Sequence, residues 1–385
     1  MKKLVFYLFM LGFMLLLLEG VAFLTVQLVD RDDYFDSRQS VFARLTAAGL
    51  AAFREKSSDP VTGWRSNGPL VREEDNCLGV PIKYSYDAAG ARLHNWFDAQ
   101  NTEVIVVGDS YTNGDEVSDS ETYPAKLAEA LGVSAVNHGV GGYGPTQSLL
   151  NLQQNIGRYP QAKVVVLGIM YENLHRMMNS YRPVLYDTSS NYTLKPYMSG
   201  GKLVPHPGSS ALDSLEQFKT VADKAFDNDF WARPVAEFPY SVALGRSLGS
   251  NYFYYRRLQR EFRKLGKPEY FLSFAAKDIE MNLVALLNHY ASMAREWGVQ
   301  PVAVFIPRNH RDTSSAAKFI AQHRVAIDAS LLLGDVAGSP GIDWEKFNLQ
   351  EEGSDNTCHP SPYGYQAIAD YIAQLMRENN AWPRS

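Results

Sequence analysis

Apolar residues dominate the start of the chain. Residues 4–18 form an apolar run that follows Lys2 and Lys3, and a second apolar stretch covers residues 21–29. One helix over both stretches would exceed the roughly 20 residues that cross a bilayer, and the two lysines would hold its N-terminus in the cytoplasm. The pattern predicts a single-pass membrane anchor over residues 1–30, with the body of the protein on the extracytoplasmic side.

A cleaved signal peptide is the alternative interpretation of this segment. Residues 4–18 have the length of a secretory apolar core, and Gly20, Val21 and Ala22 form a cleavage site with small residues at its ends. The apolar run continues past Ala22, which favours the anchor. Under both interpretations the body of the protein is exported from the cytoplasm. Glu19 either binds a partner within the membrane or reaches toward the lipid headgroups.

Short β-branched runs alternate with helical patterns from residue 103 onward. Strands are predicted at residues 104–107, 135–137, 164–167 and 301–306, and helices at residues 123–131, 146–156, 279–297 and 363–376. Strands that alternate with helices indicate a doubly wound α/β sheet with mainly parallel strands. Residues 175–278 lose this rhythm, and we interpret them as an insertion over the sheet, with a hairpin near residues 195–203.

The remaining segments divide the chain further. Helical spacing of apolar residues predicts a helical stalk over residues 31–58, and turn-forming residues predict a turn and β segment over residues 59–102. The main α/β domain is expected to cover residues 103–378, and a short tail follows at residues 379–385.

Composition and charge narrow the function classes. Hydrophobic residues make up 45% of the chain and charged residues 21%, which matches folded soluble proteins and excludes a disordered, collagen-like or polytopic membrane chain. The formal net charge of -5 supplies no cationic field for a phosphate backbone. We therefore expect no nucleic-acid partner.

A serine and a histidine occupy positions where ligands of open parallel sheets bind, beyond the carboxyl ends of the strands. Ser110 follows the first predicted strand, and His359 precedes the last predicted helix, with Asp355 four residues before it. A serine hydroxyl becomes a nucleophile when a histidine, held by a carboxylate, removes its proton. These residue types therefore predict acyl-transfer chemistry.

Four separated blocks of the sequence resemble those of the SGNH hydrolases, a branch of the GDSL esterase and lipase superfamily. Residues 104–111, which read Val-Ile-Val-Val-Gly-Asp-Ser-Tyr, are similar to the first block of the family. The whole resemblance covers residues 103–173 and 300–376. It implies a three-layer α/β/α, flavodoxin-like fold with a mainly parallel sheet, to which the N-terminal transmembrane helix is added. It also implies a reaction that needs neither a metal nor an organic cofactor.

The resemblance assigns roles to individual residues. Ser110 is the nucleophile, His359 is the base, and the backbone N–H groups of Ser110 and Gly142 stabilise the oxyanion. Gly142 takes the glycine position because it stands five residues after Asn137, as the family's glycine does. The amide of Asn173 would complete the oxyanion hole.

The third block departs from the family pattern. Members usually have Gly-x-Asn-Asp, whereas here Gly168 is followed only later by Glu172 and Asn173. Either Asn173 or Glu172 therefore occupies the oxyanion position. A carboxylate there would oppose the oxyanion, which favours Asn173.

The fourth block departs as well. The family pattern is Asp-x-x-His, and here Asn356 stands three residues before His359. Asp355 could still orient the imidazole. Otherwise the enzyme works as a Ser-His dyad or uses a carboxylate from Glu351 or Glu352.

Two further features are compatible with this site. Cys77 and Cys358 either form a disulfide that staples the N-terminal segment to the catalytic loop or are two unrelated thiols. Cationic side chains that follow strand ends are candidates for holding a substrate; they are Arg176, Arg182, Arg308, His310 and Arg311.

Two functions remain as hypotheses. The first is a membrane-anchored, exported serine esterase or O-acyltransferase that acts on O-acyl groups, above all O-acetyl groups, of a cell-envelope or secreted polysaccharide or of a small molecule. Water as acceptor gives a deacylase, and a sugar hydroxyl gives a transferase. The second is a catalytically silent SGNH-like domain that binds glycan or scaffolds an envelope assembly.

Overall fold

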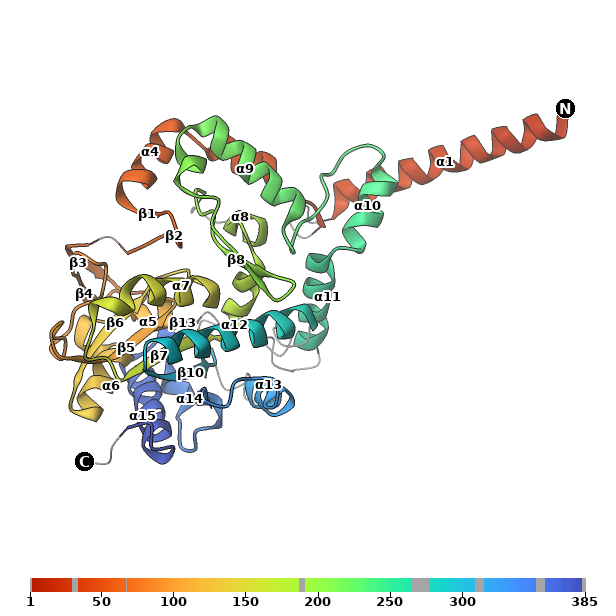
Figure 1. Cartoon of the computed structure of the whole chain (residues 1–385). Helices are drawn as coiled ribbons and strands as arrows, with labels where there is room; N and C mark the ends of the chain where they lie inside the picture. Colours follow the sequence, from red (N-terminus) through yellow and green to blue (C-terminus); the bar gives the residue numbers. More distant parts are fainter. Residues whose placement is uncertain are drawn as a thin grey trace.

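The computed structural model describes residues 2–29, 34–66, 68–186, 191–264, 277–308, 315–350 and 357–382. Its centre is a five-stranded parallel sheet in the order β11-β10-β7-β5-β6. The strands are β5 (Thr102–Gly108), β6 (Ser134–Gly139), β7 (Val164–Met170), β10 (Gln300–Ile306) and β11 (Leu332–Asp335). Numbered along the chain, the order is 2-1-3-4-5, which is the flavodoxin order. The predicted α/β fold is therefore confirmed (Figure 1).

Helices cover both faces of this sheet. On one face lie α6 (Tyr123–Leu131) and α15 (Pro362–Glu378), and on the other lie α7 (Pro145–Asn155) and α12 (Lys277–Glu296). Successive strand residues point to opposite faces, so Val104 and Val106 pack on the α6 side while Ile105 and Val107 pack on the α12 side. The sheet is buried on both faces, as parallel sheets usually are.

Local signals set the ends of α6. The Thr122 hydroxyl accepts a hydrogen bond from the Ala125 N–H at the start of the helix, where Pro124 also stands. Gly132 ends the helix at a φ of +69°, a left-handed conformation that favours glycine.

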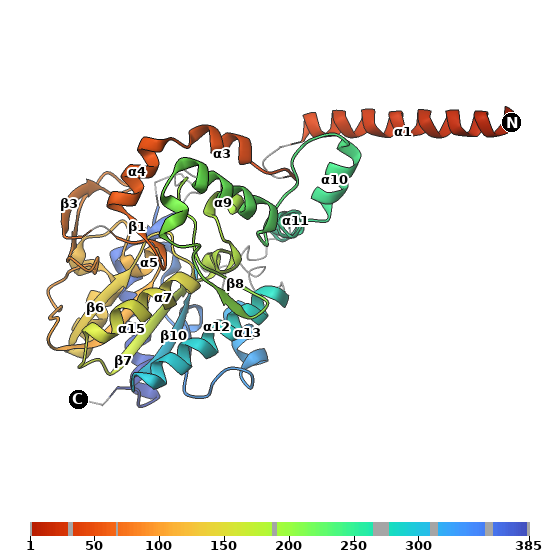
Figure 2. The same ribbon diagram turned by 45° about the horizontal axis from the view of Figure 1, so that its top comes forward.

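The described residues of the N-terminal segment form a long apolar helix and two short ones. Helix α1 (Lys2–Leu28) is long and apolar enough to cross a membrane and projects away from the body (Figures 1 and 2). Helices α3 (Arg38–Arg44) and α4 (Ala47–Lys56) follow, and Val41 and Leu50 are buried in the main core. The stretch expected as a stalk is therefore packed on the body, because its apolar residues meet the insertion.

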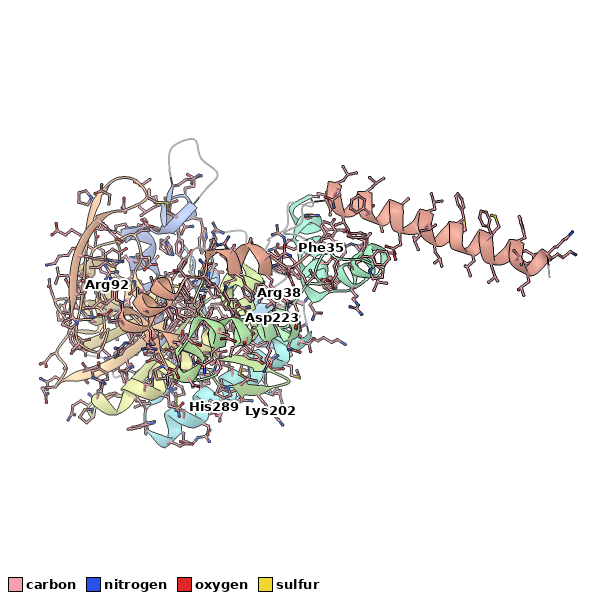
Figure 3. The ribbon with its side chains drawn as sticks, turned by 90° about the horizontal axis from the view of Figure 1, so that it is seen from above. Phe35, Arg38, Arg92, Lys202, Asp223 and His289 are labelled. Carbon is pink, nitrogen blue, oxygen red and sulfur yellow. A yellow bond between two sulfur atoms is a disulfide. The ribbon has the colours of Figure 1, made fainter. Side chains whose placement is uncertain are left out.

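An ion-pair cluster fastens α3 to the insertion. Arg38 binds Asp36 at 3.0 Å, Asp223 at 2.7 Å and Asp227 at 2.6 Å. Figure 3 labels Arg38 and Asp223 near the start of the body. The two last carboxylates belong to α9 (Leu215–Asn228), so the beginning of the body and the insertion are held together by one guanidinium.

Several short strands precede the sheet. Strands β1 (Ser58–Asp59) and β2 (Gly63–Trp64) pair antiparallel, as do β3 (Leu70–Asp75) and β4 (Pro81–Tyr86), in line with the predicted turn and β segment.

The insertion is mostly helical and shares the core on the α12 side. It contains the 3₁₀ segment η3 (Tyr171–Met178), α8 (Arg182–Leu185), the hairpin of β8 (Tyr197–Ser199) and β9 (Lys202–Val204), α9, α10 (Tyr240–Leu248) and α11 (Asn251–Lys264). Its apolar side chains, among them Tyr181, Phe218 and Phe226, join the cluster that covers the sheet.

The C-terminal part completes the fold around the sheet edge. Helix α13 (Ser315–His323) precedes β11, and α14 (Trp344–Phe347) leads into the antiparallel pair of β12 (Asn348–Gln350) and β13 (Thr357–Pro360). Strand β13 delivers the chain to α15.

Candidate active site

Ser110 stands at the carboxyl end of β5 as the first residue of the short helix α5 (Ser110–Asn113). The preceding residue, Asp109, caps this helix, because its Oδ1 accepts a hydrogen bond from the Tyr111 N–H at 2.9 Å. The Ser110 side chain is therefore not used as the cap. Although only 8% exposed, its hydroxyl is available for another partner.

That partner is His359. Its Nε2 lies 2.9 Å from the Ser110 Oγ, although 249 residues separate the two in the sequence. Strand β13 carries the histidine, and the Tyr111 ring meets its imidazole edge-on, with ring centroids 5.6 Å apart. The structure thus brings together the two residues expected to act as nucleophile and base.

The expected orienting carboxylate, Asp355, lies outside the described residues, as do Glu351, Glu352 and Asn356. Within the described part of the chain, Asp115 lies near the imidazole, with its Oδ2 3.9 Å from the His359 Nε2. In a catalytic triad the acid holds the other ring nitrogen, Nδ1. Asp115 therefore lies on the Nε2 side of the imidazole, the side that meets the serine, and does not occupy the triad position.

Sequence reasoning missed Asp115. It follows the sharp turn at Gly114, whose φ of +82° reverses the chain directly after α5. Its Oδ1 accepts a hydrogen bond from the Asn113 amide at 2.5 Å, and its backbone carbonyl accepts one from the Tyr365 hydroxyl at 3.0 Å. A spacing of five residues from Ser110 gives no sequence signal of its own.

Besides the Ser110 N–H, the two other predicted donors of the oxyanion hole lie in different segments of the chain. Gly142 is in the β6–α7 loop at a φ of +83°, a conformation that favours glycine. Asn173 is buried in η3, where its Nδ2 donates to the Asp109 Oδ2 at 2.6 Å. An amide nitrogen carries two hydrogens, so this bond uses one of them.

Asp109 links the ends of two strands. Besides Asn173, its Oδ2 accepts a hydrogen bond from the Met170 N–H at 3.3 Å, at the end of β7. Burial raises the pKa of Asp109, and the hydrogen bonds from Asn173 and Tyr111 oppose that rise. Glu172, the alternative for the oxyanion position, is instead paired with Arg308 at 3.6 Å.

The glycine loop, which comprises residues 139–144, packs tightly on α5. A Cβ atom on Gly139 would lie 2.1 Å from the Asn113 nitrogen, so only glycine allows this approach. The neighbouring His138 is buried, and its Nε2 lies 2.8 Å from the Tyr159 hydroxyl. Burial lowers the pKa of His138 to about 3, which keeps it neutral. His138 thus packs in the core.

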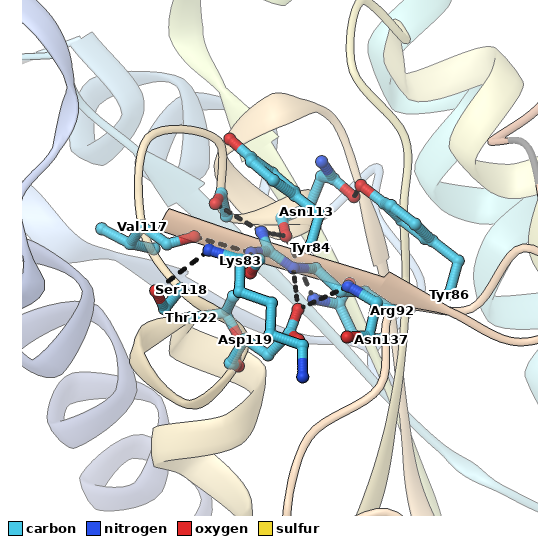
Figure 4. Close-up of polar contacts among 12 residues, drawn as sticks. Lys83, Tyr84, Tyr86, Arg92, Asn113, Val117, Ser118, Asp119, Thr122 and Asn137 are labelled. Carbon is cyan, nitrogen blue, oxygen red and sulfur yellow. Dashed lines mark hydrogen bonds and ion pairs between the residues drawn. The ribbon is translucent and has the colours of Figure 1, made fainter. Parts of the chain in front are cut away.

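Arg92 holds the loop that follows Ser110. Its guanidinium is fully buried, donates to the carbonyls of Asn113 at 2.7 Å and Val117 at 2.6 Å, and pairs with Asp119 at 3.0 Å (Figure 4). It also lies over the Tyr84 ring at 4.1 Å. Arg92 therefore ties the hairpin of β3 and β4 to the turn that follows Ser110, a role that nothing in the sequence pattern indicated.

A disulfide links the hairpin of β3 and β4 to the strand that carries His359. Cys77, in the turn between β3 and β4, is bonded to Cys358, the residue before His359, with a Cα–Cα distance of 6.6 Å. The Cys77 N–H also donates to Glu116 at 2.7 Å. The same hairpin thus contacts both the loop after Ser110 and the strand that carries His359.

No group of three or more His, Cys, Asp or Glu side chains suited to a metal ion is found among the described residues. The predicted arginines Arg176, Arg182 and Arg308 lie near the ends of the strands, whereas His310 and Arg311 are outside the described part of the chain.

Comparisons with known proteins give distant similarities. No family model and no curated protein matches this chain. A solved lipolytic protein of the G-D-S-L family from Desulfitobacterium hafniense is 12% identical, over 71% of this chain and 99% of that one, with a TM-score of 0.33.

Two solved carbohydrate-active esterases are also similar. An acetyl xylan esterase from the rumen bacterium Butyrivibrio proteoclasticus is 11% identical over 74% of this chain and 65% of that one, with a TM-score of 0.32. A family two carbohydrate esterase from Clostridium thermocellum, solved with cellohexaose, is 11% identical over 76% of this chain and 68% of that one, with a TM-score of 0.34.

Proposed function

We propose that this protein is an exported, membrane-anchored serine esterase or acyltransferase of the SGNH type. The observation that carries the proposal is the 2.9 Å contact between the Ser110 Oγ and the His359 Nε2, at the carboxyl end of a parallel sheet with the flavodoxin strand order. This is the place where ligands of such sheets bind. The substrate is an O-acyl ester, with O-acetyl groups of an envelope or secreted polysaccharide as the expected class.

In the first half of the reaction the Ser110 Oγ attacks the carbonyl carbon of the ester while the His359 Nε2 takes its proton. The tetrahedral intermediate collapses, the bond from carbon to the alcohol oxygen breaks, and the alcohol leaves with the proton from His359. The acyl group remains on Ser110. Asp115 stabilises the transient imidazolium, because its carboxylate lies 3.9 Å from the protonated nitrogen.

In the second half, water or a sugar hydroxyl attacks the acyl carbon. His359 takes the proton of the attacking group and returns it to the Ser110 Oγ as the acyl bond breaks. Water yields a carboxylic acid, and a hydroxyl yields a new ester. In both halves the N–H groups of Ser110 and Gly142 and the remaining amide hydrogen of Asn173 stabilise the oxyanion.

The N-terminal helix supports the proposed location. Helix α1 is long and apolar enough to cross a membrane, and in this proposal Lys2 and Lys3 lie on the cytoplasmic side and the body lies outside. A disulfide between Cys77 and Cys358 fits an oxidising compartment.

Hydrolysis of p-nitrophenyl acetate by the full-length protein tests the proposal. We expect Ser110→Ala and His359→Ala each to lower kcat at least about a thousandfold, the loss typical of triad residues. The exposed Ser209 and His289 provide matched control variants, Ser209→Ala and His289→Ala, which should retain wild-type rates. A folded wild type without activity or reaction with a fluorophosphonate would instead favour the catalytically silent glycan-binding domain.

A further inference from the structure

Arg182, the first residue of α8, lies against the glycine loop at the rim of the candidate active site. A Cβ atom on Gly142 would lie 2.1 Å from the Arg182 Nη1, so the guanidinium packs directly on this glycine. A Cβ atom on the neighbouring Gly141 would lie 3.4 Å from the Asp115 carboxylate, which faces His359. Arg182 is therefore close to where a bound ester would enter the oxyanion hole.

The charge of Arg182 lacks a counter-ion among the residues that the structure describes. Its side chain makes no hydrogen bond or ion pair with any of them, and its buried Nε has no acceptor. Glu172, whose charge reaches Arg182, is already paired with Arg308 at 3.6 Å. Burial and the charge of Arg176 lower the pKa of Arg182 to about 10, which leaves it a cation at neutral pH.

Arg176 places a second cation beside the first. A Cβ atom on Gly144 would lie 2.9 Å from the Arg176 Cβ, so this arginine borders the same loop. Its Nη1 donates to the Tyr143 carbonyl at 3.4 Å, its guanidinium lies 5.7 Å from the centre of the Tyr186 ring, and its buried Nε has no acceptor. Two adjacent, largely buried guanidinium groups repel each other, and an anionic ligand relieves that cost.

We propose that Arg182, supported by Arg176, binds a carboxylate carried by the acylated substrate. The substrate class is then an acylated acidic glycan, such as a polymer of uronic acids, because a guanidinium binds a carboxylate through two parallel hydrogen bonds. This inference rests on the proposed function, since it names the substrate of the same site.

Release of acetate from two acetylated glycans tests the inference. Acetylated polygalacturonate carries a carboxylate on each sugar, and acetylated xylan oligosaccharides are neutral. We expect the wild type to have the higher kcat/KM on the acidic substrate, and Arg182→Gln to lower the ratio of the two kcat/KM values about tenfold, as loss of a charged hydrogen bond predicts. The exposed Arg158 supplies a control, because Arg158→Gln removes the same charge and should leave the ratio unchanged. An unchanged ratio in Arg182→Gln would overturn the inference.

A binding measurement separates this inference from the proposed function. Trigalacturonate, which has no ester, should bind to the Ser110→Ala protein and bind about tenfold more weakly when Arg182→Gln is added. Such binding by a protein whose wild type neither hydrolyses esters nor reacts with a fluorophosphonate would preserve the anion subsite and remove the proposed serine esterase or acyltransferase. Hydrolysis of both acetylated glycans without Arg182-dependent binding would preserve the esterase and remove the subsite.

An independent observation concerns the outer end of α1. The Glu19 carboxylate accepts hydrogen bonds from the N–H groups of Tyr240 at 2.8 Å and Ser241 at 3.2 Å and from the Ser241 hydroxyl, so it caps α10. The Phe23 ring meets the Tyr240 ring edge-on at 5.1 Å. Val26 is fully buried in the same contact. Both ribbon views show α10 beside this end of α1 (Figures 1 and 2).

In a membrane-spanning α1 with Lys3 at the inner edge of the hydrocarbon layer, Glu19 and the start of α10 would lie near the outer edge. From Lys3 to Glu19 a helix rises about 24 Å, which is less than the roughly 30 Å of the hydrocarbon layer. Next to this contact, large apolar side chains are exposed: Phe238 is 71%, Val242 46% and Leu248 49% accessible. We infer that α10 and Phe238 lie in the outer lipid interface and that α1 stays attached, because cleavage after Ala22 would remove the Glu19 cap.

Fluorescence in lipid vesicles tests this second inference. A polarity-sensitive dye on Phe238→Cys of the full-length protein should be quenched by lipids that carry a nitroxide near the headgroup. The same dye on Lys202→Cys, in the exposed hairpin of β8 and β9, should remain unquenched (Figure 3). Equal quenching at the two positions, or a mature protein that starts after Ala22, would overturn the inference.

Discussion

Asp109 and Ser110 are adjacent in the chain and have different tasks. Asp109 caps α5 and accepts the Asn173 amide and the Met170 N–H, which joins the ends of β5 and β7. Ser110 is thereby released from capping, and its hydroxyl meets His359. A carboxylate that serves as the cap is therefore what makes the neighbouring serine available for chemistry.

At the residue scale, buried His138 should make the protein sensitive to acid. Its pKa is lowered to about 3 by burial, whereas an unfolded histidine has a pKa near 6.5, so the unfolded state binds the proton first as the pH falls. The resulting stability is present above about pH 6.5 and is lost progressively as the pH falls toward 3, by up to about 1.4 kcal/mol per pH unit.

Urea unfolding from pH 7 to pH 4 measures this effect. We expect wild type to lose stability relative to His138→Gln as the pH falls below 6.5, because the glutamine does not titrate. The exposed His289 provides the control, since His289→Gln should follow the wild-type curve. Parallel curves for wild type and His138→Gln would contradict a depressed pKa at this residue.

At the element scale, the hairpin of β3 and β4 positions both halves of the site. Arg92, which leads from this hairpin toward the sheet, holds the loop after Ser110 through the carbonyls of Asn113 and Val117. The disulfide in the hairpin turn holds the residue before His359. The distance between serine and histidine therefore depends on an element that contributes no reactive group.

Replacement of Arg92 should damage both stability and activity. Arg92→Met leaves buried carbonyls without donors and Asp119 without its ion pair, so we expect a loss of about 3–5 kcal/mol in the free energy of unfolding and a lower kcat. Arg72 also lies over the Tyr84 ring, at 4.6 Å, but its side chain is 47% exposed. The matched variant Arg72→Met should lower the free energy of unfolding by less than about 1 kcal/mol. Equal losses in the two variants would show that Arg92 does not hold the loop after Ser110.

Reduction of the disulfide should lower activity. Without the bond between Cys77 and Cys358, the strand that carries His359 loses its link to the hairpin, and the free energy of unfolding should fall by about 2–4 kcal/mol. Dithiothreitol should therefore lower the kcat of wild type and leave that of Cys77→Ser unchanged, because the variant has no bond to break. Full activity of the reduced wild type would show that the disulfide does not position His359.

Patterns of apolar residues predicted the elements well where the runs are long. The four predicted strands became β5, β6, β7 and β10, because continuous β-branched runs are typical of strands buried on both faces. Strand β11 was missed, since it has four residues at the edge of the sheet and two of them are only half-buried.

The candidate site was predicted less completely, for a physical reason. Ser110 and His359 carry a recognisable local pattern, whereas Arg92 and Asp115 act through contacts between segments that are distant in the chain or turned by Gly114. In the third block the strand continues to Met170, three residues beyond the predicted end, so Asn173 follows the strand closely. Asn173 thus lies three residues beyond the end of β7.

At the scale of the whole molecule, the N-terminal helix and the insertion form one structural unit. The insertion touches α1 through α10 and reaches the glycine loop through Arg182. Under the two inferences drawn above, one inserted segment would set both the position of the protein at the membrane and the charge of the substrate that it accepts.

The central claim is that Ser110 is a nucleophile activated by His359, and intact-protein mass spectrometry after fluorophosphonate treatment tests it most directly. The account predicts one adduct on the full-length wild type, mapped to Ser110, no adduct on Ser110→Ala, and labelling slowed at least about a hundredfold in His359→Ala. An adduct on another residue, or equal labelling of wild type and Ser110→Ala, would contradict the account.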